Sequence, residues 1–424
     1  MAERTMLGER LLEMPVPEFS TARSLLSARA VRARAETLLK AGLDGRLDHF
    51  VVDLDRLGPC ADAVVETIRD AYPDLAIPYH ARWRHFSVGG FERWGSLVHA
   101  APFEDPAEQA RAAFDLVVVS VLLDAGAGPT WRYEEGRTGE TYARSEGLAV
   151  ASFDMFVSGL FSSAPEDPFR ADARALASLT EAELADGFQV SPTNPLVGLP
   201  GRTALLNRLG QVAAADPEGF GPDARPGFLF DRIKARAQDG EVAAEAVLEV
   251  LLTHLGPIWP GRIVLDGVDL GDAWRHPLAG GTGPTEGLVP FHKLSQWLAY
   301  SLLEPLEEAG LTVTGLDALT GLPEYRNGGL FLDTGVLALR RPEEAKQAHP
   351  VESRLVVEWR ALTVALLDRL APLVRERLGI KDPAELPLAK VLEGGTWATG
   401  RRLAKSLRPE GAPPLAIASD GTVF

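Results

Sequence analysis

Basic and aromatic side chains are concentrated in residues 76–90, which read AIPYHARWRHFSVGG. Arginine presents a rigid fork of donors that suits a phosphate or a carboxylate, and aromatic rings present faces on which a flat ligand can stack. We therefore predict a ligand site here. The alternative is a surface segment whose arginines pair with nearby acids. The residues concerned are Tyr79, Arg82, Trp83, Arg84 and His85.

A single acid, Asp124, stands near the end of an apolar segment that we expect to be a buried helix. The helix dipole is negative at that end, so the carboxylate needs a compensating charge. Arg132 and Arg137 follow in the next loop and are the candidates for it. A carboxylate held in this way can be poised for catalysis. The alternative is a solvated turn residue.

A glycine-rich segment, residues 319–337, carries two more acids, Glu324 and Asp333. Two carboxylates close together are what acid–base chemistry at a glycosidic bond requires, although such a segment can also be an ordinary turn. With Asp124 they form the predicted catalytic set. Glu358 is a fourth acid, for which a salt bridge to Arg354 within a helix is the simpler interpretation. The neighbouring predicted binding residues are Tyr325, Arg326 and Asn327.

Two predicted helix starts could bind a ligand. In residues 194–210, glycines precede a helix whose free N–H groups suit an anion, although the Gly-Lys-Ser/Thr ending of a P-loop is absent. In residues 286–302, His292 and Gln296 share a helix face. Ordinary helix starts are the alternative in both places. The predicted binding residues of the two segments are Arg132 from the preceding loop, Arg202, His292, Lys293 and Gln296.

The composition limits the classes of function. The chain has 424 residues and a net charge of −16, which argues against a nucleic-acid polymer as partner. One cysteine, Cys60, can build neither a disulfide framework nor a Cys-rich zinc site. The first residues contain no apolar signal core, and the longest aliphatic run is too short to cross a bilayer. We expect a cytoplasmic protein that needs no cofactor or metal and does not bind a membrane.

The patterning predicts a mainly α fold, a large helical globular protein with one or two short β-hairpins. Apolar periodicity and caps predict helices over residues 105–126, 240–256, 289–310 with a kink at Pro305, and 352–379 with a kink at Pro372. Hairpins are predicted at 261–274 and 413–424. A Pro/Gly-rich span at 164–200 divides residues 1–190 from 191–424 as two helical lobes, unless the chain is one domain.

Six segments, taken in order, resemble the uracil catabolism protein 4 family, which is also described as a domain of unknown function. They are IPYHARWRHFSVGG, LLDAGAGPTWRY, NPLVGLPGR, GLVPFHKLSQWLAYSLLEPLEEAG, LPEYRNGGLFLDTGVL, and the tail LEGGTWATGRRLA with PPLAIASDGTVF. The resemblance covers nearly the whole chain. VPFHKL and EWRALTVALLD are also similar to queuosine-nucleotide N-glycosylases, which are helical.

The resemblance implies a place in a pyrimidine-degrading route of fungi and bacteria. There a cyclohydrolase-like enzyme opens the ring of a uracil ribonucleotide, and a later step must release urea from a ribosylurea phosphate. We therefore expect a hydrolase that cleaves the N-ribosidic bond, in which acids stabilise the oxocarbenium-like state and activate water. The expected phosphate ligands are Arg82, Arg84, Lys293 and Arg202, and the expected partners of the urea or uracil group are Gln296, Asn327, His292 and Tyr325.

Two alternatives remain open. One is a uracil phosphoribosyltransferase, for which VLDGVDLGDAW and GGTGPTEG are poor copies of the expected acidic pair and phosphate loop. The other is a non-catalytic subunit that associates with the enzymes of the pathway. Expected partners are thus a small nucleotide-derived substrate and, for the second alternative, other proteins of the route.

Overall fold

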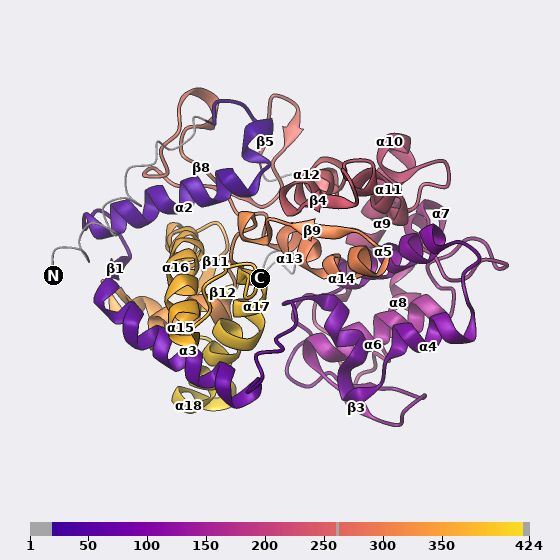
Figure 1. The fold of residues 1–424 in the computed structure, drawn as a ribbon, viewed down its shortest axis with the longest axis horizontal. Coiled ribbons are helices and arrows are strands. Elements are labelled where there is room, and N and C mark those ends of the chain that lie inside the picture. Colours follow the sequence, from indigo (N-terminus) through magenta and orange to yellow (C-terminus); the bar gives the residue numbers. More distant parts are fainter. Residues whose placement is uncertain (1–18, 260–262, 419–424) are drawn as a thin grey trace.

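The computed structural model describes residues 19–259 and 263–418. Helices dominate, which confirms the predicted mainly α class (Figure 1). The α-helices are α2 (Ala28–Leu43), α3 (Leu57–Ala71), α4 (Arg93–Ala100), α5 (Pro106–Leu122), α6 (Arg144–Val157), α7 (Ala173–Ser178), α8 (Glu181–Gly187), α9 (Leu199–Ala215), α10 (Pro217–Phe220), α11 (Leu229–Lys234), α12 (Ala244–Leu255), α13 (Lys293–Ser301), α14 (Leu303–Glu308), α15 (Tyr325–Asp333), α16 (Arg354–Leu378), α17 (Leu388–Val391) and α18 (Ala398–Leu407). Two other segments matter for the site: 3₁₀ turns in η3 (Arg82–Gly90) and the π-helix η9 (Leu392–Trp397).

The described strands are short and pair in twos. Antiparallel pairs are β1 (Phe50–Val52) with β10 (Leu337–Leu339), β2 (Tyr133–Glu134) with β3 (Thr141–Tyr142), β5 (Val264–Leu265) with β6 (Val268–Asp269), and β7 (Ala273–Arg275) with β8 (Leu288–Pro290). Parallel pairs are β4 (Glu241–Ala243) with β9 (Thr312–Thr314), and β11 (Ala348–Pro350) with β12 (Ala416–Ala418).

The hairpin predicted at 261–274 is confirmed as β5 and β6. Its turn residues Asp266 and Gly267 both have positive φ, as a tight hairpin turn requires. The hairpin predicted at 413–424 is not what the described part of that segment forms: β12 pairs in parallel with β11, which comes from much earlier in the chain. The remainder of that segment, residues 419–424, lies outside the described residues.

Helix α5 forms as its sequence predicts. Asp105 caps it, accepting a hydrogen bond from the Ala107 N–H at 2.9 Å, and Pro106 occupies the first turn, where it costs no helix bond. Its second half is buried on nearly all sides. The helix ends at Leu122, earlier than the predicted end at Gly126 or Gly128, so Asp124 lies just beyond the helix.

The helix predicted over 289–310 is two helices, α13 and α14. The first residues of the segment belong to β8, and α13 begins only at Lys293. The chain breaks at Leu302 rather than kinking at Pro305, because Pro305 lies in the first turn of α14, where its missing N–H is tolerated. By contrast, α16 continues through Pro372 as one element.

One buried apolar cluster runs from Ala28 to Leu415. Helix α16 packs against both α2 and α3, so elements from the two ends of the chain share this core. The boundary predicted at 164–200 stays a prediction.

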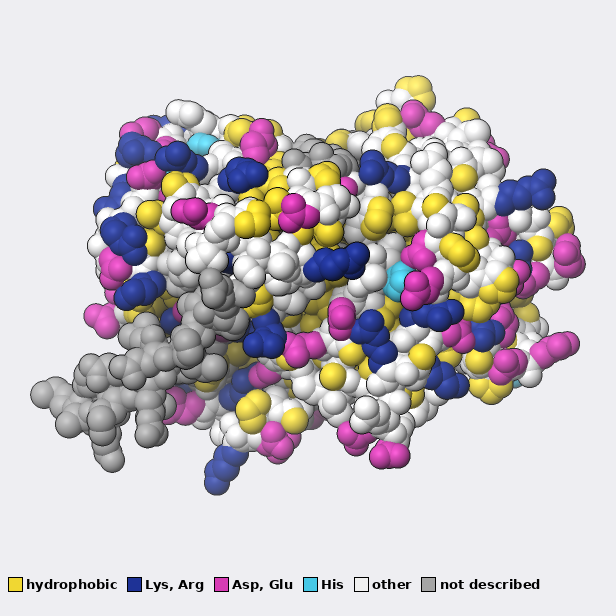
Figure 2. Space-filling view, turned by 90° about the horizontal axis from the view of Figure 1, so that it is seen from above, with side chains coloured by type: hydrophobic (Ala, Val, Ile, Leu, Met, Phe, Trp, Pro, Cys, Tyr) yellow, Lys and Arg dark blue, Asp and Glu magenta, His cyan; other side chains and the backbone are white. Residues whose placement is uncertain are grey.

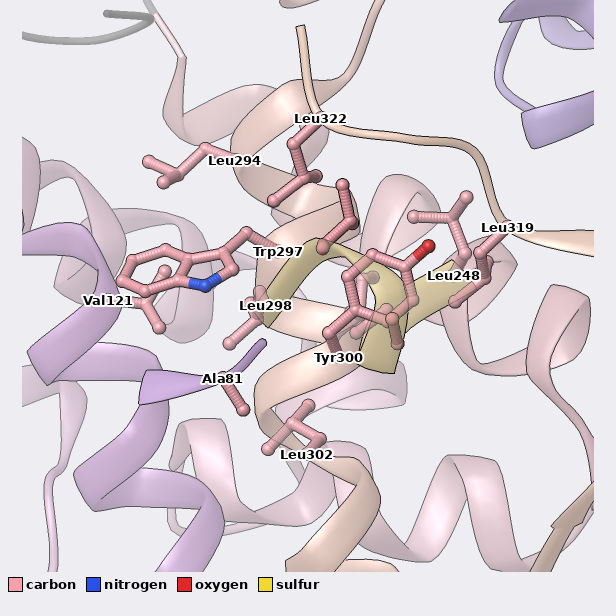
Figure 3. Close-up of a cluster of buried hydrophobic side chains, with 14 of the residues drawn as sticks. Ala81, Val121, Leu248, Leu294, Trp297, Leu298, Tyr300, Leu302, Leu319 and Leu322 are labelled. Carbon is pink, nitrogen blue, oxygen red and sulfur yellow. The ribbon is translucent and has the colours of Figure 1, made fainter. Parts of the chain in front are cut away.

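Helix α13 lies in the middle of the molecule (Figure 1). Its buried face carries Leu294, Trp297, Leu298 and Tyr300, with Trp297 next to Val121 of α5 (Figure 3). Because the helix is surrounded by packed side chains, its first residue is held at a fixed place in the interior.

The surface carries mixed charge. Figure 2 shows lysine and arginine side chains interspersed with aspartate and glutamate on one face, without a broad basic patch there. Among the described residues, no helix has the length and apolarity that crossing a bilayer requires.

Candidate functional site

The charge of Asp124 is compensated from η3 and α6. Nη2 of Arg82 lies 2.7 Å from Oδ1 of Asp124, and the Ser145 Oγ lies 2.8 Å from both carboxylate oxygens. Burial opposes ionisation, but Arg82 holds the pKa of Asp124 below its usual range. The expectation that Arg132 or Arg137 compensates Asp124 is wrong, because these side chains bind elsewhere.

Arg82 is fully buried, and both of its Nη groups are engaged within the protein, whereas its Nε has no hydrogen-bond partner among the described residues. Its guanidinium donates to the Ser145 carbonyl at 2.7 Å, the Ser120 carbonyl at 3.3 Å and Nδ1 of His85 at 3.0 Å, and it lies over the Trp297 ring at 5.2 Å. Burial and Arg82 lower the pKa of His85 to about 4. Arg82 therefore acts as a fixed positive charge against Asp124, and its two Nη groups are not available to a phosphate.

Glu324 is the second carboxylate of the site and the N-cap of α15. Its oxygens accept hydrogen bonds from the backbone N–H groups of Arg326, at 2.7 Å, and Asn327, at 2.5 Å. Burial nevertheless raises the pKa of Glu324, against the effect of these bonds and of Lys293. A buried carboxyl of this kind keeps its proton to a higher pH than a solvated one.

Lys293 is the first residue of α13. Its backbone N–H donates to Oδ2 of Asp272 at 3.0 Å, and its ammonium makes no hydrogen bond or ion pair with any residue that the structure describes. Burial lowers the pKa of Lys293, while Glu324 and Asp124 act to raise it. The ammonium is thus close enough to both carboxylates to interact with their charges.

We call these residues the central cluster: Arg82, Asp124, Ser145, Lys293, Glu324 and Tyr325. Tyr325 belongs to it because Glu324 and Asp124 both act on its phenol, whose pKa is raised first by burial. Helices α6, α13 and α15 all begin at the cluster. In the view of Figure 1, α15 and α6 lie on opposite sides of α13. Three helix N-termini favour negative charge at this point, which suits two carboxylates and an anionic ligand.

Two backbone outliers flank the cluster. Arg144, before Ser145, has a φ of 55°, and His292, before Lys293, has a φ of 50°. Left-handed backbone at a non-glycine residue costs free energy and is often found where a functional side chain must be aimed. Both outliers therefore mark the cluster as a site built against local preference.

Sequence reasoning missed several residues of this region, Glu393 above all. Glu393 lies on the π-helix η9, and its Oε2 is 2.6 Å from Nδ1 of His80. Burial opposes it, but His80, His85 and Arg84 lower the pKa of Glu393. The sequence LEGGTW gives no signal of its own, and the π-helix, a rare element that is frequently functional, is visible only in the structure. Ser145 and Arg144 gave no local signal.

The two acids of the 319–337 segment are not brought together. Glu324 caps the start of α15 and Asp333 is its last residue, so the helix rise of about 1.5 Å per residue separates their backbones by roughly 13 Å. Both oxygens of Asp333 are taken by Arg408, at 2.7 and 2.6 Å. Only Glu324 lies in the central cluster.

Arg202 and Arg132 bind carbonyl groups. The Arg202 guanidinium donates to the carbonyls of Leu123 at 3.0 Å, Ala125 at 2.9 Å and Gly126 at 3.2 Å, and burial lowers the pKa of Arg202 to about 10. It satisfies the end of α5 rather than presenting a fork to an anion. Arg132 is exposed and donates to the carbonyls beside it.

Four other predicted binding residues form hydrogen bonds within the protein around the cluster. His292 bonds to the Leu25 carbonyl, Gln296 to Thr320, Arg326 to the Gly411 carbonyl, and Asn327 to Thr396. Tyr79 and Arg84 lie farther out. The Tyr79 hydroxyl donates to Glu307 at 3.0 Å, and exposed Arg84 is 3.5 Å from Glu304.

The expected Glu358–Arg354 pair does not form, because Glu358 accepts from the Asp48 and His49 N–H groups and Arg354 pairs with Asp48.

The arrangement suits acid–base chemistry. Two carboxyls from different elements, Asp124 and Glu324, have pKa values displaced in opposite directions, one down beside Arg82 and one up by burial. In such a pair one carboxyl can act as a proton donor while the other is ionised. In the described part of the chain, no group of three His, Cys, Asp or Glu side chains is placed to hold a metal ion.

Comparison with known proteins gives three matches. A family model described as protein of unknown function (DUF1688) matches residues 24–424. The chain is 43% identical over 411 residues to Protein urg3 of Schizosaccharomyces pombe, covering 95% of this chain and 99% of that protein. It is 40% identical over 415 residues to Uracil catabolism protein 4 of Lachancea kluyveri, covering 90% of this chain and 93% of that protein. The matched range contains every residue of the central cluster.

Proposed function

The chain belongs to the DUF1688 family, its relatives indicate a role in uracil catabolism, and from this premise we propose that it is a hydrolase of ring-opened uracil nucleotides. The proposed substrate is of the ribosylurea 5-phosphate type. The reaction cleaves the N-ribosidic bond with water and releases urea and a sugar phosphate.

The observation that supports this proposal most strongly is the pair Asp124 and Glu324 with opposite pKa displacements. Cleavage of a bond between an anomeric carbon and nitrogen builds positive charge on the sugar and requires a proton on the leaving nitrogen. Glu324, whose burial favours its protonated form, supplies the proton to urea. Asp124, held ionised by Arg82, faces the positive charge.

The 5-phosphate has donors at the edge of the cluster. Arg144 is exposed and makes no hydrogen bond or ion pair with the described residues, while it acts electrostatically on Tyr325. Arg84 is also exposed but lies farther out, paired with Glu304 at 3.5 Å. Arg144 also opens α6, whose first N–H groups have no side-chain cap. Guanidinium groups beside a helix N-terminus suit a phosphate.

The test uses the purified protein with ribosylurea 5-phosphate and a coupled assay for urea. We expect one urea for each sugar phosphate formed. A parallel reaction with uracil and phosphoribosyl pyrophosphate is assayed for nucleotide. Nucleotide in the second reaction without urea in the first would establish a transferase and overturn the proposal. Absence of both products, with tight binding to a ring-opening enzyme of the route, would favour a non-catalytic subunit.

A further inference from the structure

Lys293 differs from the buried arginines because its ammonium makes no hydrogen bond or ion pair with the residues that the structure describes. Four buried arginines pair with carboxylates: Arg82 with Asp124 at 2.7 Å, Arg93 with Glu135 at 2.6 Å, Arg225 with Asp115 at 2.9 Å and Arg360 with Asp272 at 2.7 Å. Three others, Arg34, Arg202 and Arg326, donate hydrogen bonds to backbone carbonyls. Lys293 is half-buried and has no such contact among the described residues, although two acids lie near it. An interior cation is normally paired, so this side chain calls for a functional explanation.

The backbone of Lys293 is held rigidly. Asp272 accepts its N–H at 3.0 Å and is itself fixed by two bonds from Arg360, at 2.8 and 2.7 Å. The preceding residue, His292, has left-handed backbone and bonds to the carbonyl of Leu25 at 2.9 Å. These contacts determine where the lysine stem starts and leave its amino end free.

The two neighbouring acids are already engaged by other donors. Asp124 binds Arg82 and Ser145, and Glu324 binds two backbone N–H groups of α15. Neither is within ion-pair distance of the lysine nitrogen. Burial lowers the pKa of Lys293, so a larger share of it is the free amine, which is the form that attacks carbon.

We propose that Lys293 is the nucleophile of the reaction and carries the sugar phosphate as an imine. This inference rests on the proposed function and specifies how the bond is broken. Nζ forms a bond to the anomeric carbon, the bond from that carbon to the urea nitrogen breaks with its electron pair, and Glu324 gives that nitrogen a proton, which releases urea.

The sugar is then freed without any oxidant or reductant. The lysine nitrogen loses its extra proton to a carboxylate, the bond between the anomeric carbon and the ring oxygen opens as that oxygen takes a proton, and a carbon–nitrogen double bond forms. Water adds to this carbon, the bond to Nζ breaks, and the aldehyde form of the sugar phosphate leaves. The sum is one water consumed and one urea and one sugar phosphate produced.

The imine can be trapped from the product side with ribose 5-phosphate as the probe. The protein is incubated with this sugar and sodium borohydride, digested, and analysed by mass spectrometry. We expect about one adduct per chain, located at Lys293, with the mass of ribose 5-phosphate less one oxygen. Lys234→Arg, at an exposed lysine of α11, is the matched control and should label like the wild type.

The variant Lys293→Arg keeps a positive charge but cannot form the imine, so it should lose both the adduct and urea release. A second variant distinguishes nucleophile from charge. Lys293→Cys treated with 2-bromoethylamine regains an amine at the same place, and the only other cysteine, Cys60, is buried with its pKa raised to about 11. We expect this treatment to restore the adduct and urea release.

Urea release is measured in parallel without borohydride, so that the two proposals can fail separately. Urea release by a wild type that gives no adduct at Lys293, or full urea release by Lys293→Arg, would overturn the nucleophile and leave the hydrolase. Absence of urea from the wild type would overturn the hydrolase, and an adduct that forms equally in Lys293→Arg would overturn the imine at this residue.

Discussion

The substitution Glu324→Gln removes the proposed proton donor while changing the fold little. The amide retains an oxygen that can accept one of the two backbone N–H groups that Glu324 now caps. Loss of an N-cap costs about 0.5–2 kcal/mol of stability. Loss of a general acid costs about 10²–10⁴ in rate, which corresponds to roughly 3–5 kcal/mol in the barrier. The expected fall in urea release is therefore far larger than partial unfolding could cause.

The pH profile makes the prediction specific. Urea release should fall as pH rises through the raised pKa of Glu324, because the donor is then ionised. It should fall at low pH as Asp124, whose pKa lies below its usual range, takes up a proton. In Glu324→Gln the high-pH fall should disappear along with most of the activity.

The matched control is Asp172→Asn. Asp172 caps α7 by accepting from the N–H groups of Arg174 and Ala175, both at 3.1 Å, and lies outside the central cluster. This variant should lose a comparable amount of stability in urea denaturation and keep wild-type urea release. Wild-type activity and an unchanged pH profile in Glu324→Gln would refute the assignment, as would an equal loss of activity in both variants.

Three further predictions concern stability. Arg82→Met should lower the free energy of unfolding by about 3–5 kcal/mol, since it leaves Asp124 buried without its partner. Chemical denaturation of this variant and of Asp124→Asn tests the prediction. A cost within about 1 kcal/mol of zero for Arg82→Met would contradict the prediction. The free energy of unfolding should fall as pH drops from about 6.5 toward about 4. The pKa of His85 is lowered to about 4 in the folded protein, so the unfolded chain takes up a proton on this imidazole at a higher pH. His85→Gln should flatten this pH dependence, and an unchanged slope would refute the contribution of His85. Within α9, Gly210→Ala should destabilise the protein by about 1–3 kcal/mol, because the new Cβ would meet the α7 backbone at 2.5 Å. Gly201→Ala has open space around it and should stabilise the protein by up to about 1 kcal/mol. Equal melting temperatures for the two variants would contradict the packing of α9 on α7.

The sequence predicts local structure well where the signal is local. The Asp105–Pro106 start of α5 is correct because cap and first turn act over a few residues. The course of 289–310 is not, because Pro305 breaks or tolerates a helix depending on the turn it occupies. Likewise β12 takes a parallel partner from far away, which no neighbouring residue encodes.

The site was predicted in part for the same reason. Asp124, Lys293 and Glu324 could be named from their chemistry, and the structure brings all three to one place. Arg82 was predicted to bind phosphate, but its two Nη groups are taken by Asp124 and nearby carbonyls, and only the fold determines this contact between distant segments. Asp333 is only nine residues from Glu324 in the sequence, but the two acids lie at opposite ends of α15.

Cleavage of the N-ribosidic bond can be followed at the anomeric carbon itself. Ribosylurea 5-phosphate labelled with carbon-13 at that position is incubated with the purified protein and observed by NMR. We expect the signal of a carbon bonded to nitrogen to be replaced by that of a carbon bonded to oxygen, with free urea formed in equal amount. Asp124→Asn should slow the change by about 10²-fold or more. A nitrogen-bonded signal that persists in the presence of the wild-type protein would contradict this cleavage.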